Sequence, residues 1–452
     1  MSTLMASVQS ELRSLFLSYC FLKSRSSGVH KCTSCDMFVH VICGELVLKE
    51  EGWVPTVWTY IKILKMSGAV RQCFVTLVRL GAMKYARLTV HVKKHSLSIK
   101  LLSVGTLSSF TAFSYGSSSP DVESASTWMS APITDLKHLQ ENTGDMRCKM
   151  ESLIMRIQAD VCHALEKEEL EEGGKKFQVD RWLREQGGGG VTCVLQDGTV
   201  FEKAGVNVSV VTGLLPPDAA IQMRARGKKM QGEKLKFFAA GVSSVIHPRN
   251  PHVPTVHFNY RYFEVEDENG EKQWWFGGGT DLTPYYLDES DAVSFHKALK
   301  KACDPHGKHL YPKYKKWCDD YFNITHRGER RGVGGIFFDD VDEPTPEKCF
   351  EFVKSCGDSV VPSYVPIVQK NKKKSYTYDE RQWQLLRRGR YVEFNLIYDR
   401  GTKFGLYTPG ARYESILMSL PLTAKWEYMH SPEPGSREAK LVEVLKHPKD
   451  WI

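Results

Sequence analysis

Two Asx-Gly dipeptides constrain the fold of this chain more than any other local feature. Asp197-Gly198 and Asn269-Gly270 each stand between two runs rich in β-branched and aromatic residues. Glycine after Asp or Asn readily takes the positive φ of a tight turn, so each site predicts an antiparallel hairpin. The predicted hairpin strands are residues 191–195 with 199–202, and residues 255–266 with 273–276.

Further runs of similar composition extend the predicted sheet. We predict additional strands at residues 206–211, 237–247, 335–338, 390–399 and 416–426. Apolar residues recur at helical spacing in residues 145–167, and helices are also expected at 290–303, capped by Ser290, and at 346–356. Hairpins outnumber strand–helix–strand units. The fold class is therefore α+β, with one large antiparallel sheet flanked by helices on both faces.

The chemical character of the chain changes near residue 120. Residues 52–120 contain nine Lys or Arg and no Asp or Glu, and residues 115–120 have the composition of a flexible linker. We therefore predict an atypical basic extension, residues 1–127, and a large domain, residues 128–452. The extension is interpreted either as a mitochondrial targeting segment or as an unstructured addition, including one created by a wrongly joined exon.

A short motif in the extension has the spacing of metal ligands. Cys32, Cys35, His40 and Cys43 offer sulfur and nitrogen donors, the set that tetrahedral zinc prefers. The interval between His40 and Cys43 is shorter than in a zinc knuckle. The motif is interpreted either as a zinc-binding segment, with a nucleic-acid-associated role as the function it would suggest, or as a remnant without function.

Bulk properties narrow the classes of protein. A net charge of +8 on 452 residues is modest and does not indicate nucleic-acid binding. The cysteines lack a repeating spacing, which favours reduced thiols over a secreted disulfide framework. No apolar run reaches the ~18 residues that a membrane helix needs.

The predicted strand at residues 255–262 carries the most informative side chains. Because side chains alternate between the two faces of a strand, His257, Asn259 and Arg261 share one face. A proton-transfer group, an amide and a guanidinium in one row favour a substrate-facing surface, although an exposed polar sheet face has the same pattern. The partner strand continues through three glycines to Asp281, which is interpreted either as an acceptor for several N–H donors or as a turn residue.

Arginine-rich segments follow at residues 326–331 and 387–390, and around Arg400 and Arg412. The planar guanidinium suits two-point binding of a carboxylate, so these segments favour an anionic substrate. Arginine and glycine mixed with aromatic residues also occur in single-strand nucleic-acid binding, but no basic stripe dominates this domain.

Five long motifs resemble one enzyme family. They are residues 241–248, 251–261, 274–284, 326–331 and 391–404. Together they resemble oxygen-dependent coproporphyrinogen III oxidase of the animal type, and the resemblance runs from about Ser130 to Ile452. Residues 1 to about 125 do not resemble the usual N-terminal extension of that family.

The resemblance implies an activity and a setting. The family oxidatively decarboxylates two propionates of coproporphyrinogen III to vinyl groups, giving protoporphyrinogen IX in heme biosynthesis, with release of carbon dioxide and hydrogen peroxide. It implies O2 as co-substrate, no cofactor, no nucleic acid, and a homodimer in the mitochondrial intermembrane space that allows peripheral contact with the membrane. A porphyrin-binding protein without turnover is the alternative.

The resemblance also implies roles for individual residues. The family's proton donor falls on His257, and its dimer contacts fall on His326, residues 192–201 and about 391–427. Its substrate contacts fall on Ser243, Asn259, Tyr260, Arg261, Gly410, Ala411 and Arg412. Many relatives have Ser at the position of Ala411, where this chain offers backbone groups alone.

We hypothesise chemical roles for four side chains. Asp281 would accept hydrogen bonds from pyrrole N–H groups, and Arg261 and Arg400 would hold propionates. The neutral-range pKa of an ordinary histidine suits His257 to proton transfer.

Four histidines leave a metal site open as an alternative. His247, His257, His296 and His326 match positions proposed to bind a divalent metal in bacterial relatives. His296 also lies on the apolar stripe of its predicted helix, where a core histidine is the usual occupant. We expect no metal in the catalytic domain.

Overall fold

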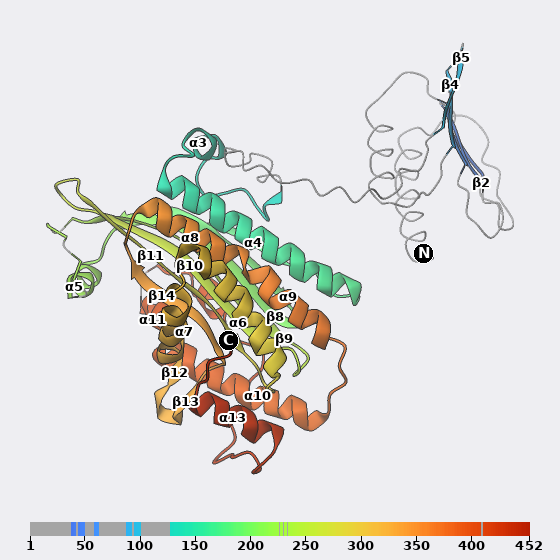
Figure 1. The fold of residues 1–452 in the computed structure, drawn as a ribbon. Helices are drawn as coiled ribbons and strands as arrows, with labels where there is room; N and C mark the ends of the chain where they lie inside the picture. Colours follow the sequence, from blue (N-terminus) through green and yellow to red (C-terminus); the bar gives the residue numbers. More distant parts are fainter. Residues whose placement is uncertain are drawn as a thin grey trace. The chain divides into compact units, whose positions relative to one another are not determined.

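The computed structural model describes residues 127–452, apart from residues 226, 229, 233, 408 and 409, together with the backbone of five strands nearer the N-terminus (Figure 1). The chain divides into two compact units, residues 1–116 and 117–452. The first unit holds a sheet in the order β1-β2-β3-β4-β5, with β3 and β4 parallel and the other neighbours antiparallel. Its strands are β1 Phe38–Val41, β2 Gly44–Lys49, β3 Trp58–Lys62, β4 Arg87–Val92 and β5 His95–Lys100.

The backbone of His40 lies in β1, whereas the three cysteines of the Cys32–Cys43 motif lie outside the described residues. The structure therefore gives no geometry for a zinc site there.

The second unit is built on a seven-stranded sheet in the order β14-β11-β10-β9-β8-β7-β6, antiparallel throughout. The strands are β6 Gln178–Leu183, β7 Gly188–Gln196, β8 Phe201–Leu214, β9 Lys236–Pro248, β10 Thr255–Glu266, β11 Lys272–Thr283 and β14 Gly334–Val341. A separate two-stranded ladder joins β12 Asn323–Ile324 to β13 Glu329–Arg330. The α+β class and the large antiparallel sheet are confirmed.

Both predicted hairpins are present, but their connections are longer than two residues. Asp197 has a φ of 54°, and the turn continues to β8 at Phe201. Gly270 has a φ of 80° inside a connection of residues 267–271. The predicted strands 199–202 and 206–211 form one continuous strand, β8.

Helices α4, α6, α8 and α9 lie side by side across the first face of the sheet (Figure 1). The even-numbered side chains of β10, such as Val256, Phe258 and Tyr260, pack beneath them in the main hydrophobic core. The helix α6 begins at Asp288, whose carboxylate accepts bonds from the backbone of Ser290 and Asp291, so the predicted cap at Ser290 was two residues late.

The remaining helices cover the edges and part of the second face. The α-helices are α3 Leu136–Glu141, α4 Met146–Glu171, α5 Pro217–Ala225, α6 Glu289–Cys303, α7 Leu310–Tyr321, α8 Pro346–Asp358, α9 Val360–Asn371, α10 Tyr378–Glu393, α11 Arg400–Tyr407, α12 Tyr413–Leu417 and α13 Arg437–Lys446. Shorter turns are η2 Asp304–His306, η3 Thr325–Arg327 and the π-helical η4 Phe394–Tyr398. Among the described residues, no helix is both long and apolar enough to cross a membrane.

Two predicted strands are wrong. Residues 390–399 complete α10 and form η4, and residues 416–426 contain the end of α12 followed by irregular chain. A capping box between Thr377 and Glu380 begins α10. The helix then continues through Tyr391 and Phe394, which are buried, so tertiary packing overrides their β-propensity.

Candidate functional site

Short polar side chains form a row across the second face of the sheet. The register pairs Thr192 with Asn207, Asn207 with Ser243, and Ser243 with Asn259 on successive strands β7 to β10. Asn259 faces Gly279 on β11. Because directly paired residues point to the same face, these side chains floor one surface, which we call the polar bay.

His257 and Arg261 lie on either side of Asn259 in the bay. The burial pattern of β10 alternates as predicted, with His257, Asn259 and Arg261 half-buried between fully buried neighbours. Tyr260 points to the other face, where its hydroxyl bonds Thr280 and the carbonyl of Cys356 at 2.5 and 3.1 Å. A substrate in the bay would therefore meet the backbone of Tyr260 rather than its ring.

A buried carboxylate sits beside His257. Asp281 pairs with His257 in the β10–β11 register, and its Oδ1 lies 2.7 Å from His257 Nδ1. Its other oxygen accepts a bond from Arg331 Nη2, also at 2.7 Å. Burial alone would raise the pKa of Asp281, but the charges of Arg331 and His257 lower it below its ordinary value. Asp281 is therefore an ionised group that orients the imidazole.

Arg331 reaches Asp281 from the segment after β13 and is itself buried. Its guanidinium carbon lies 4.0 Å from the ring centre of Phe322, 4.6 Å from that of Tyr391 and 4.8 Å from that of Phe394. This aromatic enclosure holds the charge in place without offering a competing anion. The sequence placed Arg331 in an arginine-rich segment but did not single it out as the partner of Asp281.

One end of the bay carries two arginines on one carboxylate. Asp339, in β14, accepts a bond from Arg261 Nη2 at 2.8 Å and one from Arg400 Nη2 at 3.2 Å. Arg261 also donates to Asn259 at 2.8 Å. The structure thus brings together Arg261 and Arg400, which lie 139 positions apart in the sequence. Asp339 was not among the predicted residues. It lies two positions after Phe337 in β14, so alternation along the strand places both side chains on the same face of the sheet.

The opposite end carries Arg412. Its guanidinium contacts the carboxylate of Asp180 and lies 5.7 Å from the ring centre of Trp182, both on the edge strand β6. Trp182 donates to Thr192, which also bonds Ser415 of α12 at 2.9 Å. Strand β6, which anchors Arg412, is four strand spacings from β10, or about 19 Å at the usual distance between neighbouring strands.

The other predicted contacts lie in the same region with different exposure. Ser243 is half-buried in the row, Gly410 is exposed with a φ of 72°, and Ala411 is half-buried. Pro409 lies outside the described residues.

The four histidines considered for a metal do not gather. His247 bonds Thr255 and the carbonyl of Ser419, and His296 bonds Tyr311 and the carbonyl of Val333. Within the described part of the chain, no three His, Cys, Asp or Glu side chains form a cluster suited to a metal. Burial is the main reason that the pKa values of His247 and His296 fall to about 3 and about 4.

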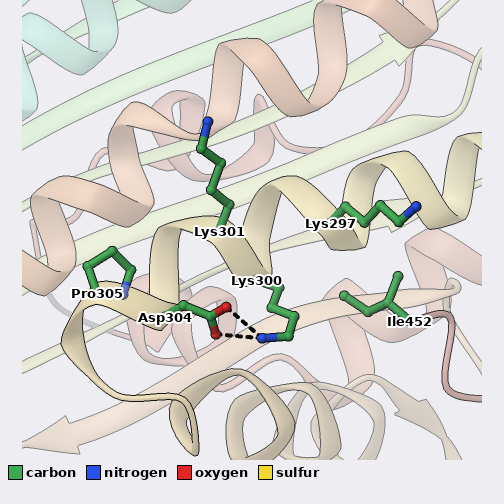
Figure 2. Close-up of a pocket in the computed structure, with 6 residues that line it drawn as sticks. All are labelled: Lys297, Lys300, Lys301, Asp304, Pro305 and Ile452. Carbon is green, nitrogen blue, oxygen red and sulfur yellow. Dashed lines mark hydrogen bonds and ion pairs between the residues drawn. The ribbon is translucent and has the colours of Figure 1, made fainter.

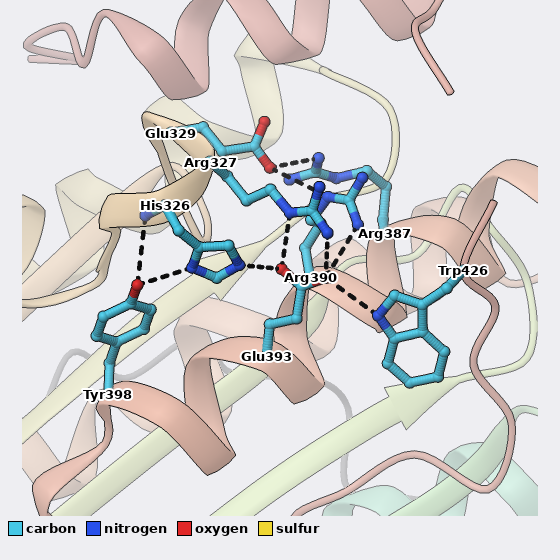
Figure 3. A network of polar contacts seen from close by, with 8 residues as sticks. All are labelled: His326, Arg327, Glu329, Arg387, Arg390, Glu393, Tyr398 and Trp426. Atoms are coloured by element: carbon cyan, nitrogen blue, oxygen red, sulfur yellow. Dashed lines mark hydrogen bonds and ion pairs between the residues drawn. The ribbon is translucent and has the colours of Figure 1, made fainter. Parts of the chain in front are cut away.

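His326 belongs to a separate polar network (Figure 3). It bonds Tyr398 at 2.7 Å and Glu393 at 2.8 Å. Glu393 also accepts bonds from Arg327, Arg390 and Trp426. Burial alone would raise the pKa of Glu393, but the bonds from Arg327 and His326 lower it to about 2.

Two arginines of the predicted cluster at residues 387–390 are paired with internal carboxylates. Arg387 is buried on Glu329 at 2.7 Å, and Arg388 is buried on Glu202 at 2.9 Å. These pairs favour a structural role for both arginines over binding of a substrate carboxylate.

A hollow of about 600 Å³ lies elsewhere, at the end of α6 (Figure 2). It is lined by Lys297, Lys300, Lys301, Asp304, Pro305 and Ile452. Lys300 pairs with Asp304 at 2.6 Å, and none of the predicted site residues lines the hollow.

Comparison with known proteins relates most of the chain to one family. Residues 149–451 match the model of the coproporphyrinogen III oxidase family. An oxygen-dependent coproporphyrinogen-III oxidase of Drosophila melanogaster is 63% identical over 389 residues, covering 84% of this chain and 98% of that protein. The mitochondrial enzyme of Homo sapiens is 65% identical over 329 residues, covering 72% of each chain. A chloroplastic coproporphyrinogen-III oxidase 1 of Arabidopsis thaliana is 54% identical over 315 residues, covering 69% and 81%.

The similarity reaches further upstream than the sequence motifs indicated. Residues 128–452 make up about 72% of the chain, whereas the match to the Drosophila protein covers 84%. That match therefore includes part of residues 1–127. A second model, of a SCAN domain-containing protein 3-like zinc finger, matches residues 27–60, which contain the Cys32–Cys43 motif.

Proposed function

The chain belongs to the family of oxygen-dependent coproporphyrinogen III oxidases, and on that premise we propose that the polar bay is its active site. The protein catalyses the oxidative decarboxylation of coproporphyrinogen III in heme biosynthesis. The family assignment does not favour a non-catalytic porphyrin carrier or a nucleic-acid-binding protein.

The reaction needs positioning and proton control from the protein. In each decarboxylation, one propionate, one O2 and one proton become a vinyl group, CO2 and H2O2. The carbon–carboxylate bond breaks, a hydrogen leaves the side chain, and two electrons pass to oxygen. An electron-rich porphyrinogen can supply those electrons itself, so we propose that O2 is used directly, without a cofactor. The remaining tasks are to hold the carboxylates and to move a proton.

The observation that carries the proposal is the pair of His257 and Asp281 beside the polar row. Because His257 Nδ1 faces the buried carboxylate of Asp281, its Nε2 is the ring nitrogen directed to other partners. An ionised carboxylate on one ring nitrogen fixes the orientation and the tautomer of the imidazole, as in other acid–base sites. We assign His257 to proton transfer with the reacting substrate.

The structure favours a revised role for Asp281. Its side chain is 2% exposed, and its two oxygens are engaged by His257 and Arg331. We propose that Asp281 acts through His257, as a positioning residue. Direct contact with pyrrole N–H groups, as the sequence suggested, stays a prediction that would require these bonds to rearrange.

Cationic groups at both ends of the bay match a large, flexible ligand with several carboxylates. Arg261 and Arg400 stand at one end on a carboxylate of β14, and Arg412 stands at the other on a carboxylate of β6, the opposite edge of the sheet. The hydroxyl of Ser243 and the amide of Asn259 lie between them. We propose that the arginines hold propionates while the polar row supports the tetrapyrrole.

Turnover tests this proposal directly. Purified protein with coproporphyrinogen III should consume O2, release CO2 and form a divinyl product. The Arg261→Gln variant should raise KM by about tenfold or more, because a charged hydrogen bond to a propionate is lost. Tight binding of coproporphyrinogen without O2 consumption would instead identify a carrier.

We propose that the active protein is a homodimer. Residues 391–427 expose aromatic side chains, including Tyr407, Tyr413 and Trp426, and His326 lies at the rim of the same region in contact with Tyr398. Exposed apolar surface of this kind is typical of an interface, and residues 192–201 are expected to contribute. Light scattering of the purified protein would distinguish a dimer from a monomer.

The mammalian relatives are mitochondrial, and this protein is assigned to the mitochondrion. We propose the intermembrane space, with peripheral contact to a mitochondrial membrane, as its place there. Protease protection in intact mitochondria and in mitoplasts, followed by salt extraction, would test both statements.

A further inference from the structure

The two arginines at one end of the bay share a single internal carboxylate. Asp339 Oδ1 accepts from Arg261 Nη2 at 2.8 Å, and Asp339 Oδ2 accepts from Arg400 Nη2 at 3.2 Å. The arginines come from β10 and α11, which are far apart in the sequence. The two oxygens of one carboxylate therefore fix the relative position of two guanidinium groups.

The carboxylate lies beneath the arginines rather than in front of them. The Asp339 side chain is 9% exposed, whereas those of Arg261 and Arg400 are 38% and 54% exposed. A substrate carboxylate approaching from solvent would meet the guanidinium groups before Asp339. Asp339 therefore supports the arginines without occupying the place of the ligand.

Neighbouring residues make room for this arrangement. A Cβ atom at Gly277 would come within 2.7 Å of both Arg261 Nη2 and Asp339 Oδ1, so the ion pair lies flat over this glycine. Arg400 also lies over the ring of Tyr321, 5.1 Å from its centre, and its backbone N–H donates to the Tyr321 hydroxyl. Strand β10 and helix α11 thus each direct one arginine toward the carboxylate of Asp339.

The charges of Arg261, Arg400 and Asp339 also affect where the two arginine side chains lie. Two guanidinium ions close together repel each other, and the negative charge of Asp339, which contacts both, reduces that repulsion. Asp340 adds a further negative charge near Arg400. Without the carboxylate, repulsion and side-chain entropy would favour an Arg400 that swings into solvent.

We propose that Asp339 is a positioning residue that holds Arg261 and Arg400 as one two-arginine clamp for a substrate propionate. The inference rests on the proposed function of the bay and adds a residue that acts on affinity through the arginines rather than by touching the substrate. It predicts an effect on KM that is larger than the effect on kcat.

The first test is the steady-state kinetics of Asp339→Asn. KM for coproporphyrinogen III should rise about tenfold, because part of the binding free energy is then needed to order the two arginine side chains. The kcat should stay within about twofold of the wild-type value. The matched control is Asp342→Asn, which removes a nearby carboxylate that pairs with Lys228 at 2.8 Å and has no contact with the clamp. The control should keep the wild-type KM.

A binding measurement separates positioning from a general loss of structure. Coproporphyrin III and its tetramethyl ester are titrated against each protein by fluorescence. Asp339→Asn should weaken the acid about tenfold and leave the ester unchanged, since the ester has no carboxylate for the clamp. Equal weakening of both ligands, an unchanged KM or a lower KM would each overturn the inference, the last by showing that Asp339 competes with the substrate.

Two further variants keep the test decisive. Asp339→Glu retains the charge and should raise KM less than Asp339→Asn, and it replaces that variant if the latter does not fold. In an Arg400→Gln background, Asp339→Asn should cause a smaller additional loss than it does alone. If the wild-type protein does not turn over coproporphyrinogen, the proposed function fails; if it does and both Asp339 variants keep its KM, the clamp alone is refuted.

Discussion

His257, Asn259 and Arg261 could be placed on one face from the sequence because strand alternation is a local property. The half-buried positions of all three agree with that prediction. The partners of these residues could not be derived in the same way. Asp339 contacts Arg261 across 78 positions. Arg331 contacts Asp281, the partner of His257, across 50 positions. Such contacts depend on strand order and packing rather than on any local pattern.

The His257→Gln variant tests the proton-transfer assignment. Loss of the imidazole should lower kcat by about 10²- to 10⁴-fold, the usual contribution of an acid–base group, with little change in KM. Oxygen consumption at saturating coproporphyrinogen would measure it. A variant that retains wild-type kcat would remove His257 from the chemistry.

Two buried histidines predict how stability depends on pH. The pKa values of His247 and His296 are lowered to about 3 and about 4, chiefly by burial, whereas both would titrate near 6.5 in the unfolded chain. The unfolded state therefore binds more protons than the folded state below pH 6.5, and stability falls as the pH falls from 6.5 toward 4. Each of the two histidines should lower the free energy of unfolding by about 1 kcal/mol as the pH falls from 6 to 5.

Urea denaturation at pH 6.0 and 5.0 would measure that loss. The His296→Gln variant is expected to be less stable overall, but its loss between the two pH values should be smaller than that of the wild type by about 1 kcal/mol. Equal pH dependence in the two proteins would show that His296 titrates normally in the folded state.

At the level of secondary-structure elements, the strands of the sheet were easier to predict from the sequence than the helices that pack on it. The predicted strands 191–195, 237–247 and 255–266 lie within β7, β9 and β10, whereas β8 joins two predicted strands and β11 continues seven residues beyond the predicted 273–276. Residues 390–399 were misassigned because Tyr391, Val392 and Phe394 favour strands by propensity. Their helical and π-helical path places Tyr391 and Phe394 around Arg331, a tertiary contact with no local signature.

The segment after β13 has a structural task that mutation can isolate. Arg331→Met should destabilise the protein by about 3–5 kcal/mol, because it leaves the carboxylate of Asp281 buried without its arginine. Chemical denaturation monitored by tryptophan fluorescence would give the free energy of unfolding. The neighbouring Arg330, half-buried and bonded to the carbonyls of Asp319 and Lys446, provides the control.

Arg330→Met should lower the free energy of unfolding by less than about 2 kcal/mol. It removes hydrogen bonds to neutral carbonyls and leaves no buried charge without a partner. A similar loss of stability in the two variants would mean that the ion pair of Arg331 and Asp281 contributes no more to stability than the hydrogen bonds of Arg330.

At the scale of the whole molecule, the chain combines an oxidase domain with an N-terminal region of different character. The model of a zinc finger matches residues 27–60, and these include Cys32, Cys35, His40 and Cys43. The match covers the segment whose spacing predicts a zinc site, and zinc binding there stays a prediction.

The zinc interpretation makes a prediction that is separate from catalysis. Full-length protein purified without chelator should contain about one zinc ion per chain, and the double variant Cys32→Ser/Cys35→Ser should lose it. Because the bay lies in the other unit, kcat and KM should stay at wild-type values. Equal zinc content in the two proteins would exclude these cysteines as ligands.

The polar bay itself is a property of the assembled sheet. Its floor needs the registers of four strands, and its two cationic ends come from β10, α11 and the chain around Arg412. Sequence motifs indicated most of these residues singly. Only the folded chain shows that His257, with its buried carboxylate, lies two residues along β10 from Asn259 and so directly beside the polar row.

The most direct test is a rapid-mixing measurement on Asp281→Asn. Protein loaded with coproporphyrinogen III without oxygen is mixed with O2, and the first release of CO2 is followed. The substitution keeps the shape of the side chain but removes the charge that orients His257. The variant should bind coproporphyrinogen with near wild-type affinity and release CO2 about 100-fold more slowly. Release at the wild-type rate would contradict the assignment of the His257 and Asp281 pair as the centre of the reaction.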